Sequence, residues 1–254
     1  MLFYYGDTVP PEIRNRNSPK MNWLCIIPAR GGSKGIPGKN LVQVAGRPLI
    51  AFTLDVACAV SRDLPSFEVF VSTDSPEIRD VVEQAGVPVP FLRPAEISGD
   101  RARSIDSVRH TLEWYHNQGK NFDAVLLLQP TSPLRSRESV LAAISTFEEA
   151  SPVADSLITV CPYRGVPLEI LYRKDGEGLG LPVLSNHGDG GRRQENEGFF
   201  VRNGAIYASS VSLIYRENRL IGLSPLLFEM REEDSLNLDT PADLEELRKR
   251  FPDE

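Results

Sequence analysis

The stretch IIPARGGSKGIPGKN, Ile26–Asn40, decides the fold of this chain. It continues an apolar run, Trp23 to Ile27, that predicts a buried strand. A helix-like segment follows from about Pro48 to Val60. Between the strand and the helix, glycines alternate with cations: the glycines are Gly31, Gly32, Gly35 and Gly38, and the cations are Arg30, Lys34 and Lys39.

A strand, a cationic glycine loop and a helix, in this order, make an arrangement that holds a polyphosphate. Glycines let backbone N–H groups approach phosphate oxygens, and Arg and Lys neutralise the phosphate charge. The loop is not a Walker loop, and the dinucleotide fingerprint Gly-x-Gly-x-x-Gly is absent. We therefore predict a nucleotide-handling enzyme. The alternative is a surface loop whose cations are merely solvated.

Length and composition bound the partners. A chain of 254 residues can form one large α/β domain or a domain with a subdomain. The net charge is −7 without a basic block, which argues against nucleic acid as a partner. Cysteines at positions 25, 58 and 161 do not form the even, closely spaced set of a disulfide framework, and Cys25 and Cys58 are predicted core residues.

Targeting signals are absent from the sequence pattern. No apolar run approaches the roughly 20 residues that a membrane span needs, and no signal-peptide pattern opens the chain. We expect no membrane partner and a cytoplasmic location. Residues 1–20 show no periodicity and are interpreted as an N-terminal extension ahead of a domain over residues 21–254.

Strand-like and helix-like segments alternate along that domain. This alternation predicts an α/β fold with a doubly wound, mostly parallel sheet that binds ligands at the carboxyl ends of its strands. Further strands are predicted at Glu68–Ser72, Ala124–Gln129, Leu157–Val160 and Ala205–Ala208, and helices after Ser75-Pro76, over Ser104–His116 and Ser136–Glu149, and from Thr240 onward.

Residues 161–200 break the alternation. They are rich in proline and glycine, and Leu168–Tyr172 is their only strand-like run. An irregular stretch of this length in a compact domain is usually functional. We interpret it as an arm or lid that reaches a second subunit; the alternative is a surface excursion.

Polar residues follow the buried strand that ends at Gln129. Gln129, Thr131 and Ser132 are placed to hydrogen-bond a ribose or the second substrate, or else they form a strand-to-helix turn with Ser132 as the helix cap. Arg135 either contacts a phosphate or lies in solvent.

Two later segments carry candidate ligands for a polar substrate. Paired arginines at Arg192–Arg193, followed by Gln194, suit bidentate capture of a carboxylate or phosphate, the alternative being a solvated turn. Asn203 and Tyr207 are placed to hold or stack on a polar group, unless Asn203-Gly204 is only a turn.

Asn237 and Asp239 form the candidate metal site. They flank Leu238, so strand alternation puts both side chains on one face. Mg²⁺ prefers oxygen ligands and keeps several waters. Alternatively, Asp239 serves only the start of the last helix, and Asp74 has the same two interpretations.

Together these motifs resemble one family. Residues 23–250 are similar to the cytidylyltransferases that activate nine-carbon 2-keto sugar acids, the CMP-sialic acid synthetase group. The motifs in chain order are Ile27–Gly35 with Lys39-Asn40, Ser72–Asp74, Arg93–Glu96, Leu128–Arg135, Arg193-Gln194, Asn203–Tyr207 and Leu238–Pro241.

The resemblance implies a nucleotidyltransferase (glycosyltransferase-A-like) fold and the reaction of CTP with a sialic, legionaminic or pseudaminic type of acid to give CMP-sugar and pyrophosphate. It also implies a homodimer whose arm, about residues 161–190, packs on the neighbour. A legionaminic-type substrate is slightly favoured.

The same resemblance assigns roles by position. Arg30, Lys34, Lys39 and Asp239 would be catalytic, and Asp239 with Asn237 would bind Mg²⁺ or Mn²⁺. Gly31, Gly32, Ser33 and Asn40 would contact the triphosphate, Arg93 and Ser104 the cytosine, and Gln129, Thr131, Ser132, Arg193, Gln194, Asn203 and Tyr207 the sugar acid.

The chain departs from the family pattern at two positions. Asn237 stands where some members have Asp, and Val166 where many have His. The alternatives are an eight-carbon (KDO) cytidylyltransferase, disfavoured because that group has an acidic motif in place of Gln129–Pro133, a sugar-1-phosphate nucleotidyltransferase, and a catalytically weak CTP-binding homologue.

Overall fold

The computed structural model describes residues 20–33, 35–166, 168–184 and 199–251. These residues belong to two compact units: a core unit, Met1–Val160 with Arg202–Glu254, and a small unit, Cys161–Val201. Each unit is described by itself. Lys34, Arg192, Arg193, Gln194 and nearly all of the N-terminal extension lie outside the described residues.

The core unit is built on a six-stranded sheet of order β10-β6-β9-β5-β1-β4. Strand β1 lies between β4 and β5 and pairs in parallel with both, and β10 pairs in parallel with β6, which confirms the predicted mostly parallel α/β fold. Strand β9 runs antiparallel to β5, a reversal that the sequence pattern did not predict. The strands are β1 Trp23–Pro28, β4 Phe67–Ser72, β5 Ala124–Leu127, β6 Ser156–Pro162, β9 Phe200–Ser210 and β10 Leu226–Glu229.

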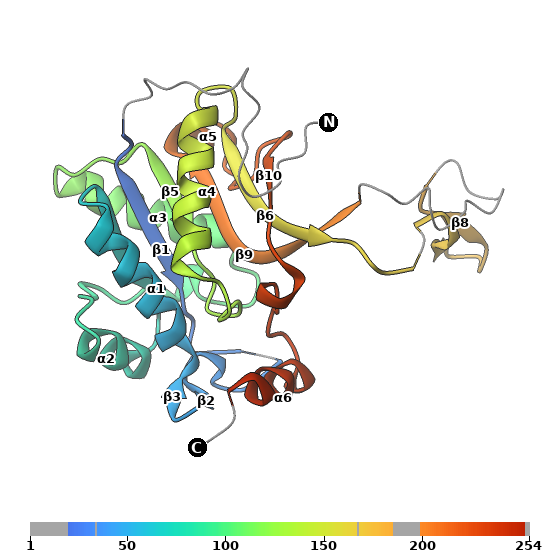
Figure 1. The fold of residues 1–254 in the computed structure, drawn as a ribbon, viewed down its shortest axis with the longest axis horizontal. Helices are drawn as coiled ribbons and strands as arrows, with labels where there is room; N and C mark the ends of the chain where they lie inside the picture. The colour runs from blue at the N-terminus through green and yellow to red at the C-terminus, as the bar shows by residue number, and fades with distance from the viewer. Residues whose placement is uncertain (1–19, 34, 167, 185–198, 252–254) are drawn as a thin grey trace. The chain divides into compact units, whose positions relative to one another are not determined.

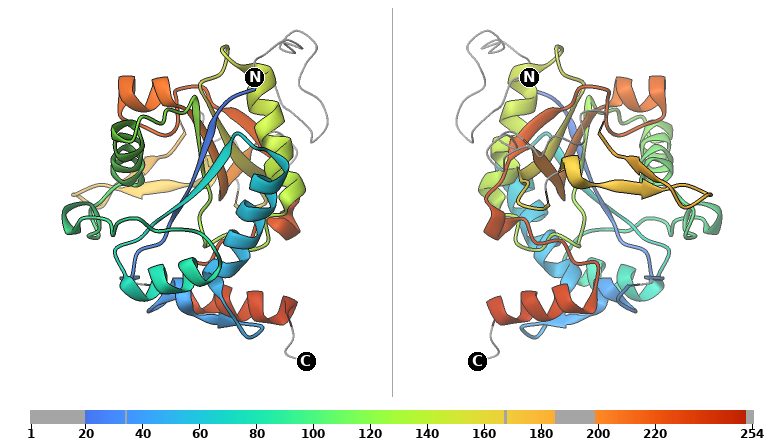
Figure 2. Two further views of the ribbon diagram at one scale, coloured as in Figure 1. Left: turned by 90° about the vertical axis from the view of Figure 1, so that its left-hand side faces the viewer. Right: turned by 90° about the vertical axis from the view of Figure 1, so that its right-hand side faces the viewer.

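Side chains of β1 alternate between two hydrophobic clusters, one on each face of the sheet. Trp23, Cys25 and Ile27 pack with residues of α1 and α4, whereas Leu24 and Ile26 pack with residues of α3 and α5. Both sets are fully buried. Figures 1 and 2 show the resulting three layers, with α1 and α4 on one face of the sheet and α3 and α5 on the other. The helices of the core unit are α1 Leu49–Asp63, α2 Pro76–Gln84, α3 Ser104–Asn117, α4 Arg137–Ala150, α5 Val211–Glu217 and α6 Pro241–Arg250.

Helix starts follow local capping chemistry. The Ser75 hydroxyl accepts a hydrogen bond from the Ile78 N–H, and Pro76 lies in the first turn of α2, as predicted. Thr240 and Asp243 form the predicted capping box of α6. The cap of α4 is Ser136, so the alternative that Ser132 caps this helix is wrong.

A third cluster fixes the base of the glycine loop. Ile36 from the loop and Leu238 pack with Leu244 and Leu247 of α6 and with Leu49 of α1. The short 3-10 helix η1 (Lys39–Leu41) and the hairpin of β2 (Gln43–Val44) and β3 (Arg47–Pro48) connect the loop to α1. The cationic loop is thus attached to the core at both ends.

The small unit contains the 3-10 helix η3 (Leu168–Ile170) and an antiparallel hairpin of β7 (Tyr172–Lys174) and β8 (Gly180–Pro182). The predicted strand over Leu168–Tyr172 is therefore wrong in most of its length. The Leu171 N–H donates to the Leu168 carbonyl, a local turn bond, and pairing with β8 begins only at Tyr172. None of the helices in the described ranges is long and apolar enough to cross a bilayer.

Candidate functional site

A cleft of about 530 Å³ opens at the carboxyl ends of β1 and β5. This is where a parallel α/β sheet is expected to bind its ligand. Segments that are distant in sequence meet here: the glycine loop, residues 97–107, residues 129–131 and the pair Asn237 and Asp239. The predicted site residues that line it are Arg30, Ser33, Lys39, Asn40, Arg93, Ser104, Gln129, Thr131, Asn237 and Asp239.

The remaining predicted site residues of the described ranges do not line the cleft. Gly31 donates its N–H to Asp74 Oδ1 at 2.9 Å, so that amide is already engaged. Ser132 is fully buried, and its hydroxyl has no hydrogen-bond partner among the residues that the structure describes. Gly32, Asn203 and Tyr207 are also absent from the lining.

Each of three cations in the cleft has an aspartate partner. Arg30 pairs with Asp100 at 3.1 Å, with both side chains well exposed to solvent. Lys39 lies 3.5 Å from Asp239 Oδ1 and donates to the carbonyl of Leu238. The third pair is Arg93 with Asp74. The Arg93 side chain is more deeply buried and lies 3.8 Å from Asp74 Oδ1. The cleft therefore presents positive charge that carboxylates hold in place.

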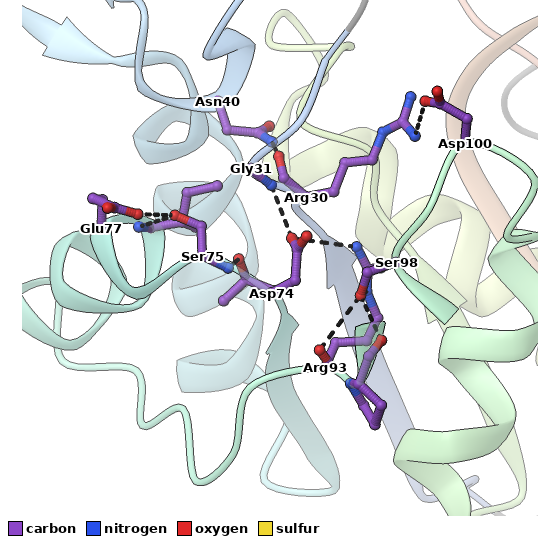
Figure 3. A network of polar contacts seen from close by, with 12 residues as sticks. Arg30, Gly31, Asn40, Asp74, Ser75, Glu77, Arg93, Ser98 and Asp100 are labelled. Carbon is purple, nitrogen blue, oxygen red and sulfur yellow. Dashed lines mark hydrogen bonds and ion pairs between the residues drawn. The ribbon is translucent and has the colours of Figure 1, made fainter. Parts of the chain in front are cut away.

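Asp74 joins the glycine loop to Arg93, as Figure 3 shows. Its Oδ1 accepts from Gly31 N–H and pairs with Arg93, whose Nε donates to Ser98 Oγ at 3.1 Å. Burial lowers the pKa of Arg93, Asp74 opposes that shift, and the nearby charge of Arg30 adds to it. Two arginines that repel each other in one cleft favour a bound anion. Asp74 thus serves the framework of the site.

The glycine loop touches the metal-candidate segment at Gly35. A Cβ at this position would lie 2.2 Å from the carbonyl oxygen of Asp239, so no residue larger than glycine fits without a backbone shift. Asn40, which follows in η1, is buried and donates from Nδ2 to the carbonyl of Arg30 at 2.9 Å. These contacts hold Lys39 and Asp239 together.

Asn237 and Asp239 share a face, as predicted, although residues 235–240 form no strand. Asn237 Nδ2 donates to Asp239 Oδ2 at 2.6 Å, while Leu238 is fully buried on the other side. The Leu238 N–H donates to the carbonyl of Thr131 at 2.8 Å. Extended backbone anchored in this way produces the alternation without a sheet partner.

The fit of this pair to a divalent cation can be judged from its oxygens. Among the described residues, no group of three or more His, Cys, Asp or Glu is placed to hold a metal. Asp239 offers a mostly exposed carboxylate to the cleft, and Asn237 Oδ1 is buried without a partner. One carboxylate fits Mg²⁺ when phosphates and waters complete the shell.

Gly204 lies in β9 with a φ of 78°. Three polar side chains surround the position that a Cβ would occupy at this residue. A Cβ there would lie 3.4 Å from Gln129 Oε1, 3.7 Å from Asn237 Oδ1 and 3.8 Å from the Tyr207 hydroxyl. Burial raises the pKa of Tyr207, so its hydroxyl remains a hydrogen-bond donor at neutral pH. Tyr207 therefore lies next to Gln129, although it does not line the cleft.

Asn203 is held by the protein itself. It is buried, its Oδ1 accepts from Thr159 Oγ1 at 2.6 Å, and its Nδ2 donates to Ser235 Oγ at 2.9 Å. The Asn203-Gly204 pair is a kink inside β9, not a turn that ends the strand.

Arg135 is buried away from solvent and does not line the cleft. Its side chain is 3% exposed and donates to the carbonyls of Ala205 and Gln129 and to Thr53 Oγ1. Both sequence-based interpretations of Arg135 are therefore wrong. Its partners Thr53 and Ala205 are 82 and 70 residues away in the chain, so no local pattern could identify them.

Several cleft residues were missed by sequence reasoning. Asp100, Ser98 and Ser107 line the cleft beside the predicted residues. They lie in or next to a loop that carries no glycine-cation motif, and only Ser104 of that region was predicted. Polarity near the start of α3 was the one available signal.

Comparison with known proteins places this cleft in a family. A family model described as cytidylyltransferase matches residues 24–249. The chain belongs to the cytidylyltransferase family. Among the described residues, the cleft is lined by members of several motifs that carry the family resemblance, including Arg30, Lys39, Arg93, Gln129 and Asp239.

Two curated members of the family are similar over most of this chain. An N-acylneuraminate cytidylyltransferase of Streptococcus agalactiae is 32% identical over 223 residues, which cover 88% of this chain and 52% of that protein. The chain thus spans about half the length of that relative. A CMP-N,N'-diacetyllegionaminic acid synthase of Legionella pneumophila is 35% identical over 229 residues, covering 88% and 93%.

Solved structures share the fold. A CMP:2-keto-3-deoxy-manno-octonic acid synthetase complexed with CTP superposes with a TM-score of 0.64 at 19% identity, covering 91% of this chain and 98% of that one. A 4-diphosphocytidyl-2C-methyl-D-erythritol synthase from Anaerococcus prevotii gives a TM-score of 0.63 at 14% identity, covering 92% and 99%. At these identities the likeness concerns the fold.

Proposed function

We propose that this chain is a cytidylyltransferase that transfers CMP from CTP to a nine-carbon 2-keto sugar acid, releasing pyrophosphate. The observation that carries this proposal is the cleft itself. Arg30 and Lys39 of the glycine loop and Arg93 of a separate segment meet around one space at the carboxyl ends of β1 and β5. The substrate class comes from the names of the relatives in Streptococcus agalactiae and Legionella pneumophila.

The reaction asks for alignment of two anions. The anomeric hydroxyl oxygen of the acid bonds to the α-phosphorus, the bond to the pyrophosphate oxygen breaks, and the hydroxyl loses its proton. Little covalent work falls to the protein, so positioning and charge neutralisation dominate. Arg30 and Lys39 neutralise charge on the leaving pyrophosphate when they exchange their aspartate partners for phosphate oxygens.

The two ends of the cleft serve the two substrates. Arg93 and Ser104 lie where the cytidine side would bind, and Lys34 is assigned to the triphosphate by family resemblance. Gln129 and Thr131 are assigned to the sugar acid, as are Arg193 and Gln194 beyond the described residues. Tyr207 lies near Gln129 and donates from its protonated hydroxyl.

A divalent cation, Mg²⁺ or Mn²⁺, completes the proposal. Asp239 would hold it, because its carboxylate is the mostly exposed acidic group beside Lys39. When bound, the ion neutralises phosphate charge and polarises the α-phosphorus. Lys39 lies close enough to Asp239 to keep that carboxylate directed into the cleft.

The small unit is proposed to be a homodimerisation arm. Ile170, Tyr172, Leu179 and Leu181 are each about half exposed or more in the chain by itself. Apolar side chains at this density on a short hairpin suit burial against a second copy. Sedimentation of the full chain would report a dimer if the arm has this role and a monomer if it does not.

The test of the function is pyrophosphate release with CTP and Mg²⁺ against sialic, legionaminic, pseudaminic and eight-carbon keto acids. We expect pyrophosphate release with a nine-carbon acid, and a legionaminic acid is the favoured one. UTP and GTP in parallel control for the base. CTP binding by calorimetry without turnover on any acid would instead indicate a catalytically weak binder, and turnover of the eight-carbon acid alone would replace the proposed substrate.

A further inference from the structure

Arg135 is a buried cation without a carboxylate partner among the described residues. It donates to the Ala205 carbonyl at 2.6 Å, to Thr53 Oγ1 at 2.6 Å and to the Gln129 carbonyl at 3.0 Å. All three acceptors are neutral oxygens. They come from β9, from α1 and from the segment directly after β5.

The buried positive charge of Arg135 does not by itself favour folding. Burial lowers the pKa of Arg135 to about 10, so the guanidinium is still charged at neutral pH. The neighbouring Cys25 thiol, whose pKa burial raises, stays neutral and supplies no counter-charge. A buried ion without a charged partner destabilises a protein unless its hydrogen bonds compensate. A well-packed apolar side chain would serve folding at least as well.

Arg135 holds the carbonyl of Gln129, a cleft residue, and the carbonyl of Ala205 in the neighbouring strand β9. Gln129 contributes its side chain to the cleft lining, and its carbonyl is fixed from behind. Ala205 follows Gly204, the bare position faced by Gln129 Oε1 and the Tyr207 hydroxyl. One guanidinium therefore fixes both the strand end that bears Gln129 and the kinked strand opposite it.

The geometry of the site requires a forked donor. A guanidinium is planar and has five N–H groups, so it can reach acceptors in three directions at once, whereas an ammonium is a point donor. Because Nη2 donates to both Thr53 and Gln129 while Nη1 donates to Ala205, each nitrogen has a distinct task.

We propose that Arg135 is a positioning residue that sets Gln129 against Gly204 and Tyr207, and thereby shapes the sugar-acid side of the cleft. The inference rests on the proposed function, since it concerns the second substrate of that reaction. Arg135 touches neither substrate and acts through the Gln129 and Ala205 carbonyls.

The test uses the full chain with the substitutions Arg135→Lys and Arg135→Met. Thr53→Val is the matched control, because it removes one acceptor and leaves both carbonyl bonds in place. Three quantities are measured for each protein: the melting temperature, the Kd for CTP by calorimetry without acid, and the KM for the sugar acid.

Both Arg135 variants are expected to raise the KM for the acid by about tenfold or more, as small misplacements of positioning groups do. Their Kd for CTP should stay within about threefold of the wild type, and Thr53→Val should lower the melting temperature while keeping the wild-type KM. In a Gln129→Ala background, Arg135→Lys should change the KM by a smaller factor than in the wild type, because part of its effect is exerted through Gln129.

Three results would overturn the inference. Wild-type KM in folded Arg135 variants would reduce Arg135 to a structural role, and so would failure of both variants to fold. A rise in KM that Thr53→Val reproduces would trace the effect to general loosening. A wild-type protein that releases no pyrophosphate with any acid is a different result, because it removes the proposed function itself.

Discussion

Arg30 in the cleft and Arg135 beneath it carry the same charged group in opposite settings. Arg30 is partly exposed and paired with a carboxylate, whereas Arg135 is buried and bonded to neutral oxygens alone. An ion pair between exposed side chains is worth about 0–1 kcal/mol, so a polyphosphate can replace Asp100 as the partner of Arg30. The bonds of Arg135 cannot be exchanged in this way. Exposed cations with carboxylate partners are suited to bind ligands, and the buried cation is suited to hold the site's shape.

The largest effect is expected from Asp239→Ala. The substitution removes the carboxylate beside Lys39 and the acceptor of Asn237 Nδ2. Turnover should fall to background, and the response to added Mg²⁺ should disappear with it. Because Asp239 is mostly exposed, the melting temperature should change little. An active variant that still responds to Mg²⁺ would put the metal elsewhere in the cleft.

Lys39→Met should lower kcat/KM by about a hundredfold, the cost of removing one transition-state contact. The variant keeps the length of the side chain but cannot neutralise phosphate. Lys120→Met is the matched control, since Lys120 also pairs with a carboxylate, Glu68 at 2.7 Å, away from the cleft. Steady-state kinetics of both variants decide the matter. Equal losses in the two would contradict a local role for Lys39.

Asp100→Asn should strengthen CTP binding by about two- to fivefold, the range that an exposed ion pair is worth. The substitution frees Arg30 from its competitor without altering the arginine. Calorimetry with CTP measures it, and Asp55→Asn, which breaks the exposed pair with Arg47, should leave binding unchanged. Weaker binding in Asp100→Asn would show that Asp100 supports the nucleotide directly and would break the comparison drawn above.

The smallest effect concerns Asp243 at the start of α6. It accepts from the N–H groups of Thr240 and Asp239, and these bonds lower its pKa from the usual 3.8. A lowered pKa contributes stability above the unfolded value, which is lost as pH falls through the folded value.

Asp243→Ala should therefore lower the melting temperature by about 2–4 °C at pH 7. The deficit should shrink as pH falls through the lowered pKa of the folded state, below which the carboxyl is protonated in both states. Glu245→Ala on the same helix is the control, because its exposed pair with Arg248 is worth little at either pH. A difference in melting temperature that does not change with pH would show that the charge of Asp243 does not cause it.

Local patterns predicted the framework well, because they depend on residues close in sequence. The buried strand over Trp23–Ile27, the cap at Ser75 and the capping box at Thr240 follow from side chains one to four positions apart. The shared face of Asn237 and Asp239 was also correct, since it needs only extended backbone.

The rest of the site depends on contacts between distant segments. Arg135 is buried because Thr53 and Ala205 approach it, and nothing near position 135 encodes that approach. The pairing of Arg30 with Asp100 likewise depends on how two loops meet. The antiparallel pairing of β9 with β5 joins strands that are distant in the chain, and the strand pattern does not report its direction. The roles of Lys34, Arg193 and Gln194 stay predictions.

The single carboxylate of Asp74 has a consequence for cooperativity. Its Oδ1 accepts a hydrogen bond from the Gly31 N–H of the glycine loop, and the same oxygen pairs with Arg93. A ligand that draws Gly31 or Arg93 away from Asp74 changes the strength of the contact that Asp74 Oδ1 keeps with the other residue. If the glycine loop binds the triphosphate and Arg93 the base, as proposed, the two parts of the nucleotide would be thermodynamically coupled, because linkage between two sites is reciprocal, and neither CMP nor pyrophosphate alone would report the affinity of the whole.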